Sequence, residues 1–377
     1  MAGGRSTDHR NLDLTQFHLD VIRGRSGGKI IWQPRIIAWY WNRALEKDGL
    51  PAPYTGMSVP DFFRKLGVST RVYNGLECFV SHEDARVRVT KRELGGDDYE
   101  ELIETPVGKQ RRVWHKDPSN AWPSRVKYEI ASEEEMRIAI WREERRTWTW
   151  DQARYEQLSE EWAGLGALTM HIPWTTVENL YVSTMGVEGG VYALADYPGT
   201  CEAYFEALNR NQEQLIEVIN ACPMEVINFG DNVHAGTLSP RLFEKYVLGV
   251  YQRRCELLHN GGKFCHAHWD GNVKPLLPYA KETGLDGIEA ITPAPQGDVT
   301  LEEAKEALGD MFLLDGIPAI YFDKTYSEKT LVEHTKRCIE LFAPNLVLGI
   351  SDEMSGTGEI ERIGLVTESV DDYNASV

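Results

Sequence analysis

Several signatures are missing from this sequence of 377 residues, and each absence excludes a class of protein. The six cysteines are scattered with no C-x-x-C spacing, which indicates reduced thiols rather than a disulfide framework. No apolar run approaches the ~20 residues that a membrane-spanning helix needs. The polar first ten residues lack the apolar segment of a secretory signal. We therefore expect a cytoplasmic protein with no membrane partner.

Positive charge is also scarce. Lys and Arg total 40 against 58 Asp and Glu, which gives a formal net charge of −18. The basic clusters, at 109–112 and 142–146, are short, and a chain this acidic repels a phosphate backbone. We therefore expect no nucleic-acid partner, and we interpret most of the acidic surplus as solvated surface.

The patterns that are present divide the chain near residue 165. Residues 1–165 are expected to hold an N-terminal arm, a first barrel segment and an inserted β-meander. The aromatic run 36–41 predicts a buried strand or a closely packed segment. Period-two alternation within 72–130 predicts antiparallel strands with one face buried. A capping box at Ser132 predicts a helix that runs towards Trp150.

Residues 166–377 follow a different pattern, in which short apolar runs alternate with amphipathic helices. The runs are 168–172, 226–229, 263–266, 287–291, 312–314 and 346–350. Six such repeats, the aromatic strand and one ambiguous segment could make eight βα units. The sequence thus predicts an α/β protein, a (β/α)8 TIM barrel with a β-rich N-terminal addition. A doubly wound open sheet is the alternative, but no glycine-rich phosphate fingerprint follows the first strand.

Unusual polar residues stand where these predicted strands end. Asp231 follows the run 226–229, His266 and His268 end the next run, and Glu289 ends the one after. Asp352 and Glu353 follow the last run. The strand ends of a parallel barrel share one rim, where active sites are built.

The spacing of the two histidines suits a metal, since residues two apart on a strand point to the same side. His266, His268, Glu289 and either Asp352 or Glu353 would complete a tetrahedral set of nitrogen and oxygen ligands typical of zinc. Each residue also has a plainer interpretation. The histidines could be structural, Glu289 and Asp352 could cap helices, and Asp231 could cap a turn.

Aromatic residues near the same strand ends could line a substrate pocket. They are Trp39, Trp41, Trp174 and Trp269. Packing in the core is the competing interpretation for these side chains.

From about residue 166 to 373 the chain resembles the uroporphyrinogen decarboxylase superfamily. The similarity lies in the order of its segments: Gly186–Glu188 with Asp196–Pro198, Gly230–Asn232 with Leu238–Phe243, His266–His268 with Asp270–Gly271, Gly284–Glu289, Asp298–Gly309, Leu314–Gly316 and Gly349–Glu353. The strip Thr105–Gly108 in a β-rich N-terminal region is similar to that of many members.

The resemblance implies three types of chemistry. Metal-free decarboxylases of the superfamily bind substrate carboxylates through a paired-arginine motif. That motif is absent here, and the corresponding stretch holds Arg35 and Arg43 with aromatic residues between them. Corrinoid-dependent methyltransferases hold zinc with His-x-Cys and a later Cys, which correspond to His266, His268 and Asp352 or Glu353. Cobalamin-independent methionine synthase adds a glutamate that Glu289 resembles in spacing.

The resemblance therefore favours a metal-dependent methyltransferase or O-demethylase. It would move a methyl group from a small methylated donor, such as a methoxylated compound, to cobalamin carried by a separate corrinoid protein. In that hypothesis His266 and His268 are catalytic, and Asp231 positions the substrate or relays a proton. A homodimer is compatible with it. The alternatives are a decarboxylase-like lyase that uses Arg35 and Arg43, and a non-catalytic binding barrel.

Overall fold

A single parallel sheet forms the centre of the molecule. The computed structural model describes residues 12–118 and 123–377. Seven strands pair in the order β1-β13-β12-β11-β10-β9-β8. Their bounds are β1 Ile31–Trp32, β8 Thr169–Ile172, β9 Val226–Val233, β10 Phe264–Trp269, β11 Gly287–Glu289, β12 Phe312–Pro318 and β13 Leu346–Ser351. All six pairings are parallel, as the alternation of apolar runs with helices predicts.

The gap between the two edge strands is bridged by residues 69–72. Val72 forms a parallel bridge with Leu168, next to β8. On the other side, Gln33 Nε2 lies 3.0 Å from Ser69 Oγ, just beyond β1. The sheet therefore curls back on itself, and the chain has a TIM-barrel-like α/β fold.

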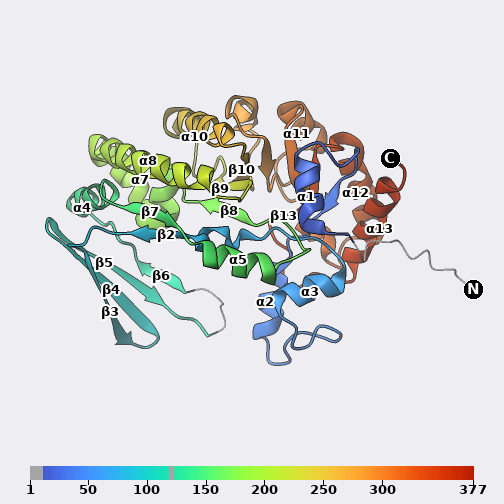
Figure 1. Cartoon of the computed structure of the whole chain (residues 1–377), viewed down its shortest axis with the longest axis horizontal. Helices are drawn as coiled ribbons and strands as arrows, with labels where there is room; N and C mark the ends of the chain where they lie inside the picture. Colours follow the sequence, from blue (N-terminus) through green and yellow to red (C-terminus); the bar gives the residue numbers. More distant parts are fainter. Residues whose placement is uncertain (1–11, 119–122) are drawn as a thin grey trace, which may run out of the picture.

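Helices surround this sheet (Figure 1). They are α1 Leu14–Ile22, α2 Ile37–Leu45, α3 Val59–Leu66, α4 Glu133–Glu143, α5 Gln152–Glu161, α6 Thr176–Glu178, α7 Gly186–Asp196, α8 Pro198–Ala221, α9 Pro240–Phe243, α10 Gly249–Asn260, α11 Leu301–Leu308, α12 Glu328–Phe342 and α13 Arg362–Asn374. Ser58, Ser239, Thr300 and Ser327 each accept a hydrogen bond from the backbone of the helix that follows. These side chains fix where α3, α9, α11 and α12 begin. In the described parts of the chain no helix combines the length and apolar character that a bilayer crossing requires.

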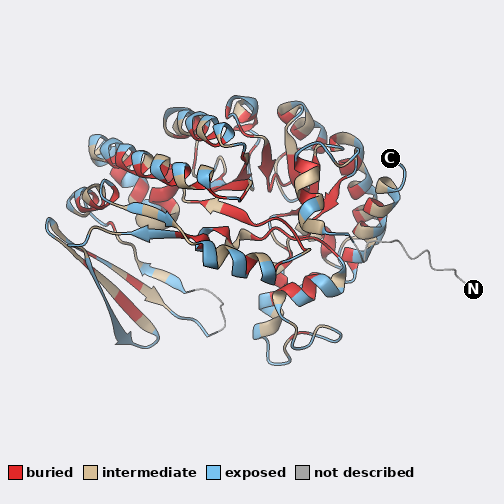
Figure 2. Ribbon diagram, viewed as in Figure 1, coloured by how far each residue is buried: buried red, intermediate tan, exposed pale blue. Residues whose placement is uncertain are grey.

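The strands are buried on both faces (Figure 2). A large apolar cluster fills the space between the sheet and the helices. A smaller cluster joins Val21 and Ile22 of α1 to residues near the starts of several strands, including Val226 and Val347. Helix α1 therefore closes the amino-terminal end of the barrel, which leaves the carboxyl-terminal end of the strands for a site.

The period-two segments form two antiparallel sheets beside the barrel (Figure 1). One is four-stranded, with β3 Arg88–Gly95, β4 Asp98–Thr105, β5 Gly108–His115 and β6 Ser124–Lys127 in consecutive order. The other pairs β2 Phe79–His82 with β7 Thr147–Trp150. Two turns of the four-stranded sheet are hairpins, as expected for neighbouring antiparallel strands.

Two expectations about local structure are wrong. Residues 37–41 of the aromatic run lie in helix α2, where Trp39 stacks on Phe62 of α3 at 5.7 Å. The first barrel strand is the preceding Ile31–Trp32. The helix that starts after Ser132 ends at Glu143. Residues 147–150 alternate in burial and pair with β2 rather than extending that helix.

Candidate functional site

Neighbouring strands bring polar side chains to one level of the barrel interior. His266 of β10 lies beside Asn228 of β9, which in turn lies beside His171 of β8. One step further along, His268 pairs in register with Glu289 of β11. Side chains two apart on a strand share a face, so the two histidines both point inward, as predicted.

Glu289 is the centre of this group. Its Oε1 lies 3.1 Å from His268 Nδ1 and 3.2 Å from Arg35 Nη1. Its Oε2 accepts hydrogen bonds from Tyr73 Oη at 2.6 Å and Asn228 Nδ2 at 3.0 Å, and lies 3.1 Å from His266 Nδ1 and 3.3 Å from Arg71 Nη1. The sequence-based grouping of His266, His268 and Glu289 therefore corresponds to three side chains in contact.

Charge keeps Glu289 ionised in this buried place. Burial alone would raise the pKa of Glu289, but Arg71, Arg35 and the two histidines hold it well below the usual range. Burial is the largest cause that raises the pKa of Tyr73 well above its usual value, and the neighbouring Glu289 carboxylate is the next. The phenol therefore keeps its proton. Burial also lowers the pKa of His266. The group thus combines one carboxylate, a neutral phenol and a ring that burial keeps neutral.

Asp315 is the second buried carboxylate of the site. Its Oδ1 lies 2.5 Å from Arg71 Nη2, and its Oδ2 lies 3.5 Å from Arg35 Nη1 and accepts a hydrogen bond from Ala290 N at 3.1 Å. Its backbone has a φ of 84°, a left-handed conformation unusual for a non-glycine residue. Such local strain is found most often at functional positions.

Asp352 and Glu353 reach the group only through Arg35. Arg35 Nη2 lies 3.9 Å from Asp352 Oδ1, and Arg35 Nε lies 3.6 Å from Glu353 Oε1. The Asp352 side chain is 54% exposed, and Glu353 Oε2 accepts a hydrogen bond from Ala38 N at the start of α2. Arg35 therefore stands between these two carboxylates and the Glu289–Asp315 pair.

Asp231 does not face the site. Its carboxylate accepts hydrogen bonds from Thr175 N and Oγ1, both at 2.7 Å, and from Tyr251 Oη at 2.8 Å. Asn228 occupies the inward position of β9, while Asp231 ties the segment after β8 to α10. In the structure this carboxylate therefore acts as an anchor between these two elements.

Of the four candidate tryptophans, Trp174 lies against the group. Its ring is 6.0 Å from that of His171, which is 6.3 Å from that of Tyr73. Trp39 is buried in the α2–α3 packing, and Trp41 is a 37% exposed surface residue. Trp269 packs on Phe243 at 5.3 Å on the outer side of β10, because His266 and His268 take the inner side. Trp39 and Trp269 therefore serve as packing residues in the structure.

The arrangement of the predicted metal ligands does not fit a zinc ion. The two histidines approach different oxygens of Glu289, and Arg35 Nη1 lies within 3.4 Å of His268 Nδ1. Arg35 and Arg71 already pair with Glu289, the predicted carboxylate ligand that contacts both histidines. Buried His266 Nε2 has no hydrogen-bond partner, but a single orphaned nitrogen is far from the three or four ligands of a zinc site.

Sequence reasoning missed four residues of the group: Arg71, Tyr73, His171 and Asn228. Arg71 and Tyr73 are two apart, which is the spacing of one strand face, but their strand is reduced to a single bridge at Val72. His171 and Asn228 stand inside apolar runs. A polar residue within such a run was the available signal, since buried polar groups need partners.

Three comparisons place the chain among known proteins. The family model of uroporphyrinogen decarboxylase (URO-D) matches residues 161–373, which is more than half of the chain. No curated protein sequence matches it. A methyltransferase from Methanosarcina mazei shares 12% identity with a TM-score of 0.56, over 94% of this chain and 97% of that one.

Two other solved structures show only weak likeness. A GH18 chitinase, ChiB, from Flavobacterium johnsoniae has 12% identity and a TM-score of 0.36, over 59% of this chain and 80% of that one. The octameric Rubisco from Pyrococcus horikoshii has 13% identity and a TM-score of 0.33, over 98% and 66%. The family match, the curled parallel sheet and the inward polar residues at its strand ends agree. The chain belongs to the uroporphyrinogen decarboxylase family.

Proposed function

We propose that this chain is an enzyme that moves a methyl group from a small methylated compound to a corrinoid protein, and that His268 assists departure of the demethylated product. The observation that carries the proposal is the 3.1 Å contact between Glu289 Oε1 and His268 Nδ1. It fixes one ring nitrogen and leaves Nε2 for the substrate. Support also comes from the family and from the methyltransferase of similar fold.

The chemistry of a methoxylated donor requires such a group. When the acceptor's electron pair forms a bond to the methyl carbon, the carbon–oxygen bond breaks and its electrons stay on oxygen. A proton from His268 Nε2 neutralises that oxygen as it leaves. A positioned general acid contributes roughly 10²–10⁴-fold to such a step. Glu289 orients the ring, as the carboxylate partner of a catalytic histidine does.

Charge in the site selects the class of donor. Two arginines, Arg35 and Arg71, face four carboxylates: Glu289, Asp315, Asp352 and Glu353. The surplus of negative charge disfavours an anionic substrate and suits a neutral or cationic one. A neutral methoxylated compound is therefore the donor that we propose, with quaternary ammonium compounds as a matched comparison.

The pairing of charges in the site also argues against the decarboxylase-like alternative. That reaction needs arginines free to bind substrate carboxylates, but Arg35 and Arg71 are already paired. The other arginine of the sequence-based hypothesis, Arg43, lies on the surface and pairs with Glu46 at 2.9 Å.

The test is methyl transfer to reduced free cobalamin from methoxylated and quaternary ammonium donors. Departure of a neutral amine needs no proton, so His268→Ala should slow transfer from a methoxylated donor by about 10²-fold or more and spare the ammonium donor. His234→Ala is the control, since His234 Nε2 bonds Thr237 outside the group. Equal slowing of both donors would refute the role of His268, and no transfer from any donor would refute the function.

A further inference from the structure

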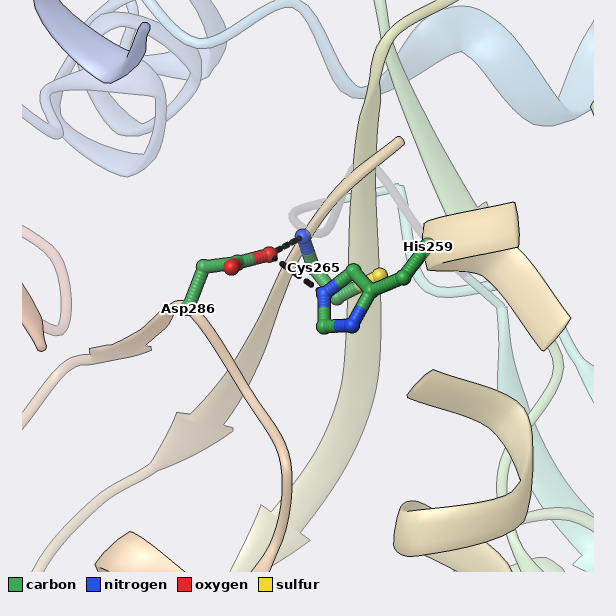
Figure 3. A group of neighbouring side chains, drawn as sticks. All are labelled: His259, Cys265 and Asp286. Carbon is green, nitrogen blue, oxygen red and sulfur yellow. Dashed lines mark hydrogen bonds and ion pairs between the residues drawn. The ribbon is translucent and has the colours of Figure 1, made fainter. Parts of the chain in front are cut away.

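A second cluster of side chains lies at the opposite end of the strands, outside the barrel (Figure 3). It joins His259 in the last turn of α10, Cys265 near the start of β10 and Asp286 just before β11. One donor atom from each lies within 4.8 Å of the others. Within residues 12–118 and 123–377, this is the group of three His, Cys, Asp or Glu side chains that meets that criterion.

Hydrogen bonds already hold the cluster in place. Asp286 Oδ2 lies 2.9 Å from His259 Nε2 and accepts a bond from Cys265 N at 2.7 Å. Figure 3 shows both contacts meeting at one carboxylate oxygen, with the sulfur of Cys265 beside the imidazole. The second oxygen of Asp286 is left for another ligand. These hydrogen bonds tie together α10, β10 and the residue that directly precedes β11.

The cluster is separate from the group around Glu289. Cys265 alternates with the inward His266, so its sulfur points away from the barrel interior. Cys255 lies one helical turn before His259 on α10, and both Cys255 and Cys265 are buried. The thiol of Cys265 is thus buried on the outer side of β10, on the side that α10 covers.

The cluster is accessible to solvent at its other two side chains. His259 and Asp286 have 39% and 34% of their side chains exposed. Asp286 also lines an open groove of about 530 Å³ together with Phe264, Lys281 and Phe312. A small cation can therefore reach the cluster without opening the fold.

We propose that His259, Cys265 and Asp286 bind one divalent transition-metal ion of the zinc class, with a water as fourth ligand. Nitrogen, sulfur and oxygen donors in one tetrahedral set suit zinc or cobalt, whereas magnesium and calcium prefer oxygen alone. On binding, the Cys265 thiol releases its proton to solvent and the sulfur becomes the ligand. The imidazole exchanges its bond to Asp286 for a bond to the metal through one ring nitrogen.

The test is titration of the full chain with Co²⁺, followed by displacement with Zn²⁺. We expect one thiolate-to-cobalt charge-transfer absorption per chain, abolished in Cys265→Ser. Loss of second-shell partners already weakens metal sites about 10–100-fold, so His259→Ala should weaken cobalt binding at least tenfold. His259 is half-exposed, so this variant should fold even if Cys265→Ser does not.

Two matched controls separate the cluster from other thiols and histidines. Cys338→Ser, at a buried cysteine that bonds Gly316 O, should keep the absorption. The double variant His266→Ala/His268→Ala should keep it as well. Absorption that is absent in the wild type, unchanged in His259→Ala or lost in the double variant would overturn the proposal.

Discussion

Arg71 Nη2 lies 2.5 Å from Asp315 Oδ1 in the barrel interior, where the two side chains are 3% and 0% exposed. The pair links residues 244 positions apart in the sequence. It also fills the space beside Gly349, where an added Cβ would lie 2.1 Å from Asp315 Oδ1. The pair therefore closes the barrel where no strand ladder joins β1 to residues 69–72.

Removal of one partner should lower the free energy of unfolding of the barrel. Arg71→Met leaves the buried Asp315 carboxylate with the more distant Arg35, 3.5 Å away, as its remaining cationic partner, which costs about 3–5 kcal/mol of unfolding free energy. Urea denaturation of the variant and the wild type measures the difference. The double variant Arg71→Met/Asp315→Leu should recover most of the loss, because no isolated charge remains. A single variant as stable as the wild type would show that the pair is not buried.

Stability should depend on pH through His18 of α1. Burial, with Arg71 and His266 as smaller causes, lowers the pKa of His18 to about 3. The unfolded chain binds a proton that the folded chain does not, so this contribution is complete above about pH 6.5 and is lost as pH falls towards 3. Between pH 6 and 4 the wild type should lose about 1.4 kcal/mol more per pH unit than His18→Leu.

The measurement is the unfolding free energy of both proteins at several pH values. His82→Leu provides the control, since His82 is an exposed residue of β2. Parallel pH profiles for the wild type and His18→Leu would contradict a neutral buried His18.

Gly230 should tolerate no side chain. A Cβ there would lie 1.6 Å from His171 Nε2, so alanine would drive His171 against Tyr73 and Trp174. We expect Gly230→Ala to cost about 1–3 kcal/mol by overpacking. Gly364 in α13 has no atom within 4 Å of its ideal Cβ, so Gly364→Ala should instead stabilise by about 0.5–1 kcal/mol. Chemical denaturation decides both, and the same sign for the two variants would refute the packing argument.

Periodicity predicted much of the fold but not the partners within the site. The runs at 226–229, 263–266 and 346–350 alternate with helices, so β9, β10 and β13 follow from local pattern. His266, His268 and Glu289 followed from their places at strand ends. By contrast, Arg71 and Asp315 meet only through closure of the barrel, which no local spacing encodes.

The outward tryptophans show the same limit. To predict that Trp39 and Trp269 line a pocket, one must know the direction in which each side chain points. That direction depends on strand register for Trp269 and on the helix α2 for Trp39. Aromatic composition favours a strand as well as a packed helix, so only the contact with Phe62 separates the two.

Two tryptophans therefore give a test of where the substrate binds. Trp174→Ala removes the ring beside His171, so under the proposed function we expect KM for a methoxylated donor to rise about tenfold. The free energy of unfolding should change little, because Trp174 is half-buried. Trp39→Ala leaves a cavity beside Phe62 and should cost about 3–5 kcal/mol of stability. Its KM should match the wild type for the folded fraction, since Trp39 donates only to Gly358 O. Steady-state kinetics and urea denaturation of both variants separate the two roles. A raised KM in Trp39→Ala alone would place the donor against α2, and not at the strand ends where His268 and Glu289 meet.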